Sequence, residues 1–358
     1  MNVLTVIILI FSILGGVDRI LGNRFGLGKE FDKAFMLIGT MALTMIGMIV
    51  ISPLIADMLV PVSKFCAEVL HIDPSIIPTS LFANDMGGAP LGVEMAQNES
   101  VGLYNALVVS SMMGCTISFT IPFALGKLNE EKHSGLLAGI LCGVATIPIG
   151  CFVAGLICRI PLLKLVIDLI PLIIFSGIIA LGLIKFPTIS IKVFKGLGVF
   201  IKILVTIGLC LGVVGFLRGK PLLPNLATAE EGVMICFNAA VVLSGAFPFM
   251  YILSKVLAKP LKTAGGKLGV NEKSILGIVS AAVTSATTFG MMDDMDKKGV
   301  VLNSAFAVSG AFTFGGHLAF TMAFDERYVV PVIVGKLISG ITALILASLI
   351  YKKLDKSI

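Results

Sequence analysis

Long apolar runs follow one another along the whole chain, and they constrain its fold more than any other feature. A helix needs roughly 20 apolar residues to cross a hydrocarbon core of about 30 Å, because each residue adds about 1.5 Å. Charged residues are only 13% of the chain, against about 25% in soluble globular domains. Nine runs meet or approach the required length, at 2–18, 34–56, 100–124, 133–156, 161–184, 195–217, 232–254, 299–324 and 330–351. The sequence therefore predicts an all-α integral membrane protein, a polytopic helical bundle that forms a single domain over residues 1–358.

Two further runs, Ser75–Gly88 and Ser274–Gly290, are shorter and more polar. Lysine and arginine concentrate on the cytoplasmic side of membrane proteins. With the amino terminus outside and both short runs re-entrant, Lys and Arg divide 20 inside to 6 outside, with Lys336 within a helix. If both runs crossed the membrane, the five lysines between 255 and 273 would fall outside. We therefore expect two re-entrant, broken helical segments and a carboxyl terminus inside.

A weak internal similarity appears at an offset of 199 residues. Residues 75–76 match 274–275, and residues 105–110 match 304–309. In each copy a long helix, a re-entrant segment, an acidic stretch and another long helix follow in the same order, and the charge-derived topology turns the copies in opposite directions. Inverted repeats of this kind are a common plan in secondary transporters. The predicted repeats lie at about 34–156 and 232–351, with connecting helices at about 161–217.

The re-entrant segments supply most of the candidate binding residues. Irregular backbone at membrane depth must face protein or a wet cavity, since its N–H and C=O groups find no partner in lipid. Inversion would bring the tips of both segments toward the bilayer midplane, where glycines allow close approach and freed helix ends present polar groups to a ligand. The candidates are Asn84, Asp85, Gly87, Gly88 and the following Glu94 in the first segment, and Thr287, Thr288 and Phe289 in the second.

Asp85 is the sharpest single candidate. A carboxylate inside a membrane costs several kcal/mol unless it is paired or hydrated, so its presence suggests a role, and a substrate ammonium would be a natural partner. The alternative is that Asp85 caps the next helix or bonds Asn84 locally. For Glu94, a favourable charge at the amino end of the next helix explains the residue equally well.

Three further polar residues lie within the long apolar runs. Neutral His317 can accept or donate a proton and line a pathway, although a hydrogen bond to a neighbouring helix would also account for it. Asn105 and Asn303 could bond a substrate hydroxyl, but the same side chains serve well in bonds between helices.

The sequence carries no signature of a metal site, a cofactor or a nucleic-acid partner. Asp293–Asp296 includes three aspartates, but two lysines follow at once, which favours a solvated loop over a metal site. The seven cysteines form no C-x-x-C pair and are interpreted as packing residues. The basic residues lie in short loops and indicate cytoplasmic anchoring, not nucleic-acid binding. Because no P-loop or other nucleotide motif is present, transport by this chain alone would be facilitated or ion-coupled.

Several short motifs, in order along nearly the whole chain, carry a family resemblance. They are Val17–Leu21, Asp85–Gly88, Ser111–Gly114, Thr146–Cys151, Phe289–Met292, Asn303 with Phe306–Ser309, Gly316–Leu318 and Ile333–Leu337. Together they resemble the bacterial ethanolamine-utilisation permease family, EutH. The resemblance implies a multi-pass protein of the bacterial cytoplasmic membrane that takes up ethanolamine. Asp85 would then serve the ammonium of ethanolamine, with Asn105 or Asn303 at the hydroxyl.

Two other functions compete with a permease at this stage. One is an intramembrane enzyme that acts on lipid and uses His317 with Asp293 or Asp294. The other is a passive channel for small amines, which lacks alternating access. A homodimer would suit a design with a fixed scaffold and a mobile core.

Overall fold

The computed structural model describes residues 3–128 and 130–354, and within these ranges it is helical with no strand. Within the same ranges, eight helices are long and apolar enough to cross a membrane. They are Val3–Ile20, Leu27–Met58, Glu99–Lys127, His133–Ile157, Leu162–Lys185, Pro187–Arg218, Ala229–Leu253 and Glu326–Tyr351. The predicted all-α, polytopic class is therefore confirmed. Residues 1–2, 129 and 355–358 of the predicted single domain lie outside the described ranges.

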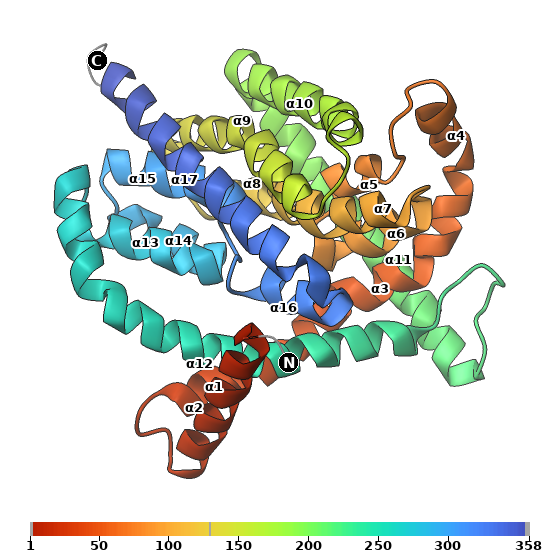
Figure 1. Cartoon of the computed structure of the whole chain (residues 1–358), viewed down its shortest axis with the longest axis horizontal. Helices are drawn as coiled ribbons and strands as arrows, with labels where there is room; N and C mark the ends of the chain where they lie inside the picture. Colours follow the sequence, from red (N-terminus) through yellow and green to blue (C-terminus); the bar gives the residue numbers. More distant parts are fainter. Residues whose placement is uncertain (1–2, 129, 355–358) are drawn as a thin grey trace.

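The α-helices and shorter helical turns are labelled in chain order, and Figure 1 shows their arrangement. The first half contains α1 (Val3–Ile20), α2 (Leu27–Met36), α3 (Ile38–Met58), α4 (Val60–Glu68), α5 (Ile76–Leu81), η1 (Asn84–Met86), α6 (Gly88–Met95), α7 (Glu99–Tyr104), the π-helical η2 (Asn105–Gly114) and η3 (Thr116–Thr120), α8 (Ile121–Lys127), η4 (Glu130–Lys132) and α9 (His133–Ile157). The second half contains α10 (Leu162–Lys185), α11 (Pro187–Arg218), α12 (Ala229–Leu268), α13 (Glu272–Val283), α14 (Ser285–Gly290), η5 (Met292–Asp294), α15 (Lys297–Ser309), α16 (Gly316–Phe324), η6 (Glu326–Tyr328) and α17 (Val329–Leu354).

Helix α12 separates an amino-terminal hairpin from the rest of the bundle. It crosses the lower part of Figure 1, and α1 and α2 pack together beneath it. The Ser12 and Ser244 hydroxyls share a hydrogen bond of 2.7 Å across the α1–α12 contact. The hairpin therefore covers one side of α12, whose other contacts include α3, α13 and α16.

Small residues let the long helices approach closely, as is usual where lipid provides no hydrophobic drive between helices. Helix α9 packs against α15 and α17, and a Cβ added at Gly150 would lie 2.3 Å from the Gly335 carbonyl oxygen. Helices α3 and α11 cross in the same way, because a Cβ at Gly208 would lie 2.0 Å from the Gly47 oxygen. The backbones at these crossings leave no room for a side chain.

Substitution of Gly208 by Ala is expected to push α11 away from α3 and lower the free energy of unfolding by about 1–2 kcal/mol, the usual cost of overpacking. Gly196 lies on the same helix with no atom within 4 Å of its added Cβ, so Gly196→Ala is the matched control. Thermal melting of the two purified variants checks this expectation. Equal melting temperatures would contradict the close crossing of α3 and α11.

One of the nine predicted crossings, the run 299–324, is wrong as a continuous helix. It divides into α15 and α16 around an irregular stretch at 310–315. The backbone N–H groups of Phe312 and Phe314 donate to the carbonyls of Ala281 and Ala282 at the end of α13, at 2.9 and 2.8 Å. The break therefore exists because these amides pair with another helix end instead of with their own helix.

Both predicted broken segments are interrupted helices in the structure. The first breaks at Phe82 and Ala83 between α5 and α6. Here Ser110 Oγ donates to the Phe82 carbonyl at 2.6 Å, and Ser118 Oγ accepts from the Ala83 N–H at 3.0 Å. The second breaks at Thr284, where the backbone is extended between α13 and α14. Every break is thus supplied with hydrogen-bond partners from protein, as burial at membrane depth requires.

An aspartate fastens the start of each broken segment to the start of the helix that follows it. Asp73 accepts from the Ser75 N–H and from the N–H groups of Gln97 and Asn98 just before α7. Asp296, just before α15, accepts from the Asn271 N–H at 3.1 Å and from Ser274 Oγ at 2.6 Å. The two halves share this element order, while their inversion and the side of the membrane on which each terminus lies remain predictions.

Candidate functional site

A cavity of about 320 Å³ lies where the first broken segment meets α16 and the irregular stretch before it. Its size is within the range of small-molecule sites, about 300–1,000 Å³. Three long helices and both broken segments contribute to its wall. The lining residues are Leu37, Thr40, Met41, Thr44, Asp85, Met86, Cys115, Phe119, Leu243, Phe247, Val283, Thr284, Phe312, Gly316 and His317.

Asp85 and His317 face one another in this cavity. The distance from His317 Nε2 to Asp85 Oδ1 is 4.0 Å, and the Asp85 side chain is 34% exposed while that of His317 is 2% exposed. This distance is too long for a direct hydrogen bond. The carboxylate therefore opens onto the cavity with capacity to accept further hydrogen bonds.

Behind His317 lies Lys336 of α17, a buried residue that is 1% exposed. Its ammonium donates to the Ser111 carbonyl oxygen at 2.7 Å and lies 3.2 Å from His317 Nδ1. A charged lysine can only donate, so with charged Lys336 the Nδ1 atom accepts and Nε2 carries the imidazole proton. The order Lys336–His317–Asp85 then points an N–H group at the carboxylate.

Local backbone geometry explains how the two cavity residues are presented. Gly87 has φ +102°, which L side chains rarely adopt, and this turn starts α6 directly after the short η1 helix that bears Asp85. His317 is the second residue of α16, just after the break at 310–315. Phe312 packs on its ring with centroids 4.9 Å apart. Each polar side chain is therefore held at a helix interruption.

The rest of the cavity wall is aromatic with a few hydroxyls. Phe119, Phe247 and Phe312 contribute rings, and Phe119 meets Phe312 edge-on at 5.7 Å. The Thr40 and Thr44 hydroxyls donate to the carbonyls of Leu37 and Met41, at 2.8 and 3.1 Å. Each hydroxyl oxygen retains lone pairs that can accept a hydrogen bond from a ligand. This combination suits a small cation that carries a hydroxyl group.

The other candidates of the first segment lie away from the cavity wall. Asn84 is fully buried, and neither of its side-chain polar atoms has a hydrogen-bond partner in the described part of the chain. Gly87 packs against Met48, and a Cβ at Gly88 would lie 2.1 Å from Ser110 Oγ. Glu94 is exposed on α6. The two glycines thus serve close packing at the break.

The predicted asparagines form bonds between helices. Asn105 Nδ2 donates to Ser75 Oγ at 2.8 Å, and Asn303 Nδ2 donates to the Ser274 carbonyl at 2.8 Å. Each therefore fastens the start of a broken segment to the helix that follows. This geometry agrees with the interhelical alternative for both residues. Neither asparagine lines the cavity of Asp85, where a substrate hydroxyl would bind.

The candidates of the second segment also divide between packing and a neighbouring cavity. Thr288 Oγ1 donates to the Gly277 carbonyl at 2.8 Å, and buried Phe289 packs near Phe123 with ring centroids 6.1 Å apart. Thr287 is exposed and lines a cavity of about 220 Å³. That cavity shares Phe247, Val283 and Thr284 with the larger one. The two cavities therefore adjoin along α12 and the second break.

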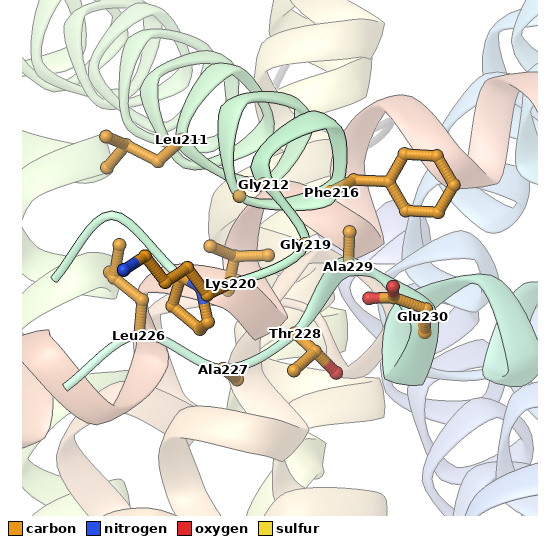
Figure 2. A pocket seen from close by; sticks show the side chains of 13 residues that line it. Leu211, Gly212, Phe216, Gly219, Lys220, Leu226, Ala227, Thr228, Ala229 and Glu230 are labelled. Atoms are coloured by element: carbon orange, nitrogen blue, oxygen red, sulfur yellow. The ribbon is translucent and has the colours of Figure 1, made fainter. Parts of the chain in front are cut away.

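A third and much smaller cavity, of about 60 Å³, lies between the end of α11 and the start of α12. Figure 2 shows its lining residues, with the Lys220 nitrogen and the Glu230 carboxylate at opposite ends of the group. Its volume is well below the usual range for ligand sites. It makes a weaker candidate than the cavity of Asp85.

The structure does not bring His317 together with Asp293 or Asp294, the pairing that the lipid-modifying enzyme would require. The carboxylate that faces His317 is Asp85 and not Asp293 or Asp294. The Asp293 carbonyl instead accepts from Lys132 Nζ at 2.5 Å, as part of a turn that also includes the Met292 carbonyl. Within the described residues no group of three or more His, Cys, Asp and Glu side chains could hold a metal ion.

Comparison with known proteins decides the family. The family model described as ethanolamine utilisation protein, EutH, matches residues 1–350. The chain belongs to the EutH family. A probable ethanolamine permease EutH of Listeria monocytogenes is 41% identical over 342 residues, which cover 96% of this chain and 92% of the relative. A probable ethanolamine permease EutH of Salmonella typhimurium is 35% identical over 392 residues, covering 99% and 96%.

A third relative, the uncharacterized protein YxeR of Bacillus subtilis, is 35% identical over 333 residues, covering 93% of this chain and 90% of the relative. No solved structure shows a significant match to the chain. Membership of a family whose relatives are named probable permeases, together with the eight apolar helices of the described chain, makes this protein a transporter of the bacterial cell membrane.

Proposed function

We propose that this protein takes up ethanolamine through the cavity that contains Asp85. The observation that supports the proposal is a carboxylate, 34% exposed, that opens into an otherwise largely apolar cavity inside a membrane protein. Ionisable residues within membrane segments generally serve transport pathways. Two relatives are named probable ethanolamine permeases, and that name supplies the substrate.

Ethanolamine at neutral pH is mostly a cation with an ammonium at one end and a hydroxyl at the other. The ammonium would donate to Asp85, and the faces of Phe119 and Phe312 would add cation–π attraction. The hydroxyl would bond Thr40, Thr44 or Thr284, all of which line the same cavity. These threonines replace Asn105 and Asn303 as partners for the hydroxyl.

A carrier is favoured over a passive channel by the way the cavity is walled. Three aromatic side chains and the two broken segments line it, and broken helices at the site are typical of carriers with alternating access. Asp85 and His317 offer groups through which an ion could couple to uptake. If uptake is facilitated and not coupled to an ion, Asp85 and His317 serve substrate binding alone.

Purified protein in liposomes tests the proposed function. We expect saturable uptake of labelled ethanolamine above that of protein-free liposomes, and counterflow, in which unlabelled ethanolamine inside accelerates entry of the label. Linear uptake without counterflow would instead support a channel. Uptake equal to that of protein-free liposomes would contradict the proposed function.

A further inference from the structure

Lys336 is a buried cation whose hydrogen-bond partners are both uncharged. Its ammonium contacts the Ser111 carbonyl and His317 Nδ1, and the residue is 1% exposed. A buried charge without a counter-ion is costly. A lysine held in this way needs a negative charge nearby, and when another cation occupies that charge, loss of the lysine proton removes the cost of the buried cation.

The titratable groups close enough to act electrostatically on Lys336, together with its hydrogen-bonded neighbour His317, come from four parts of the structure. They are His317 of α16, Asp85 of η1, Cys151 of α9 and Cys115 between η2 and η3. Thiols are ordinarily neutral at pH 7, so Asp85 supplies the negative charge within this set. Asp85 is also the carboxylate that opens into the cavity. One carboxylate therefore acts electrostatically on a buried lysine, across His317, and also opens onto the ligand space.

Two cations near one carboxylate in a low-dielectric site repel each other. We propose that the substrate ammonium and the proton on Lys336 compete for Asp85, so that binding of protonated ethanolamine expels one proton through the Lys336–His317 pair. The inference rests on the proposed function and adds to it a coupling between substrate and proton. Its consequence is exchange of one substrate cation for one proton, with the net charge of the site unchanged.

The hydrogen-bond geometry provides a balanced route for that proton. Lys336 Nζ gives a proton to His317 Nδ1, and the proton on His317 Nε2 leaves to water in the cavity. One N–H bond breaks and one forms on the imidazole, which remains neutral. The resulting lysine amine accepts from Nδ1–H and still donates to the Ser111 carbonyl. Both protonation states therefore keep their buried polar groups paired.

Calorimetry on the purified full-length protein tests the coupling, with ethanolamine hydrochloride as the probe at pH 7. Binding heats measured in buffers of different ionisation enthalpy give the number of protons released. We expect about one proton per bound ethanolamine in the wild type. Measurable binding with the same heat in every buffer would overturn the proposal. Absence of any binding would instead overturn the proposed function on which it rests.

Two variants of Lys336 are expected to shift affinity in opposite directions. Lys336→Met removes the competing cation, so ethanolamine binds about tenfold tighter with no proton release. Lys336→Arg keeps a charge that cannot be lost, so binding weakens about tenfold, also without release. Lys185, exposed at the end of α10, provides the control: Lys185→Met should behave as the wild type.

A residue that merely packs would not produce this pattern. Proton release that persists in Lys336→Met, or equal affinity in the Met and Arg variants, would overturn the role of Lys336. The wild-type buffer series needs no substitution, so it decides the question even if a variant fails to fold.

Discussion

Replacement of Asp85 by Asn is expected to remove most saturable ethanolamine uptake. The variant keeps the size of the side chain but loses the charge that the substrate ammonium would pair with. Loss of a charge-assisted hydrogen bond in a partly buried site costs about 2–4 kcal/mol. That cost corresponds to a fall of about 30- to 1,000-fold in the kcat/KM of uptake, measured in liposomes at matched protein content.

Glu94 offers a control for Asp85. It lies in the same part of the chain, is the other carboxylate that the sequence offers there as a binding candidate, and is exposed on α6. Glu94→Gln should therefore retain uptake within about twofold of the wild type, as expected for a surface charge. If Asp85→Asn retained wild-type uptake, Asp85 could not be the partner of the ammonium.

Replacement of Gly88 by Val is expected to disrupt the first broken segment. A Cβ there would lie 2.2 Å from the Phe82 carbonyl and 2.1 Å from Ser110 Oγ, the two atoms that bond each other across the break. Because the carbonyl belongs to the backbone, it cannot rotate away. Overpacking of this kind costs about 3 kcal/mol or more, and it would displace Asp85 three residues earlier, so uptake should fall with stability.

Gly290, at the end of α14 in the second broken segment, is the matched control. No atom lies within 4 Å of a Cβ added there, so Gly290→Val should melt close to the wild type. The comparison requires thermal melting of both purified variants and uptake at equal protein amounts. A Gly88→Val protein with the melting temperature of the wild type would show that the break has room for a side chain at Gly88.

The long crossings could be predicted from the sequence because each depends on local composition. Apolar length alone identifies α9, α10 and α17, for example. The break at 310–315 could not be predicted in the same way, since it depends on Phe312 and Phe314 finding carbonyls at the distant end of α13. The glycines at 310, 315 and 316 were the available local signal, and the apolar run around them concealed it.

The site shows the same division between local and distant information. Asp85 and His317 were each conspicuous as ionisable residues in apolar surroundings, yet only the fold brings them to 4.0 Å. Lys336 was counted in the charge balance without being considered for the site, although it is a lone cation within the run 330–351. The rule that marks an intramembrane carboxylate as functional applies equally to that lysine. Asn105 and Asn303 illustrate the reverse, because an amide within an apolar helix serves a helix contact as readily as a ligand.

The most direct test of the ethanolamine site is an experimental structure of the protein with ethanolamine bound. The proposed function predicts that the ethanolamine nitrogen lies about 3 Å from the Asp85 carboxylate, with its hydroxyl toward Thr40, Thr44 or Thr284. Ethanolamine bound elsewhere, such as between Lys220 and Glu230, with the cavity beside Asp85 holding only water, would contradict it.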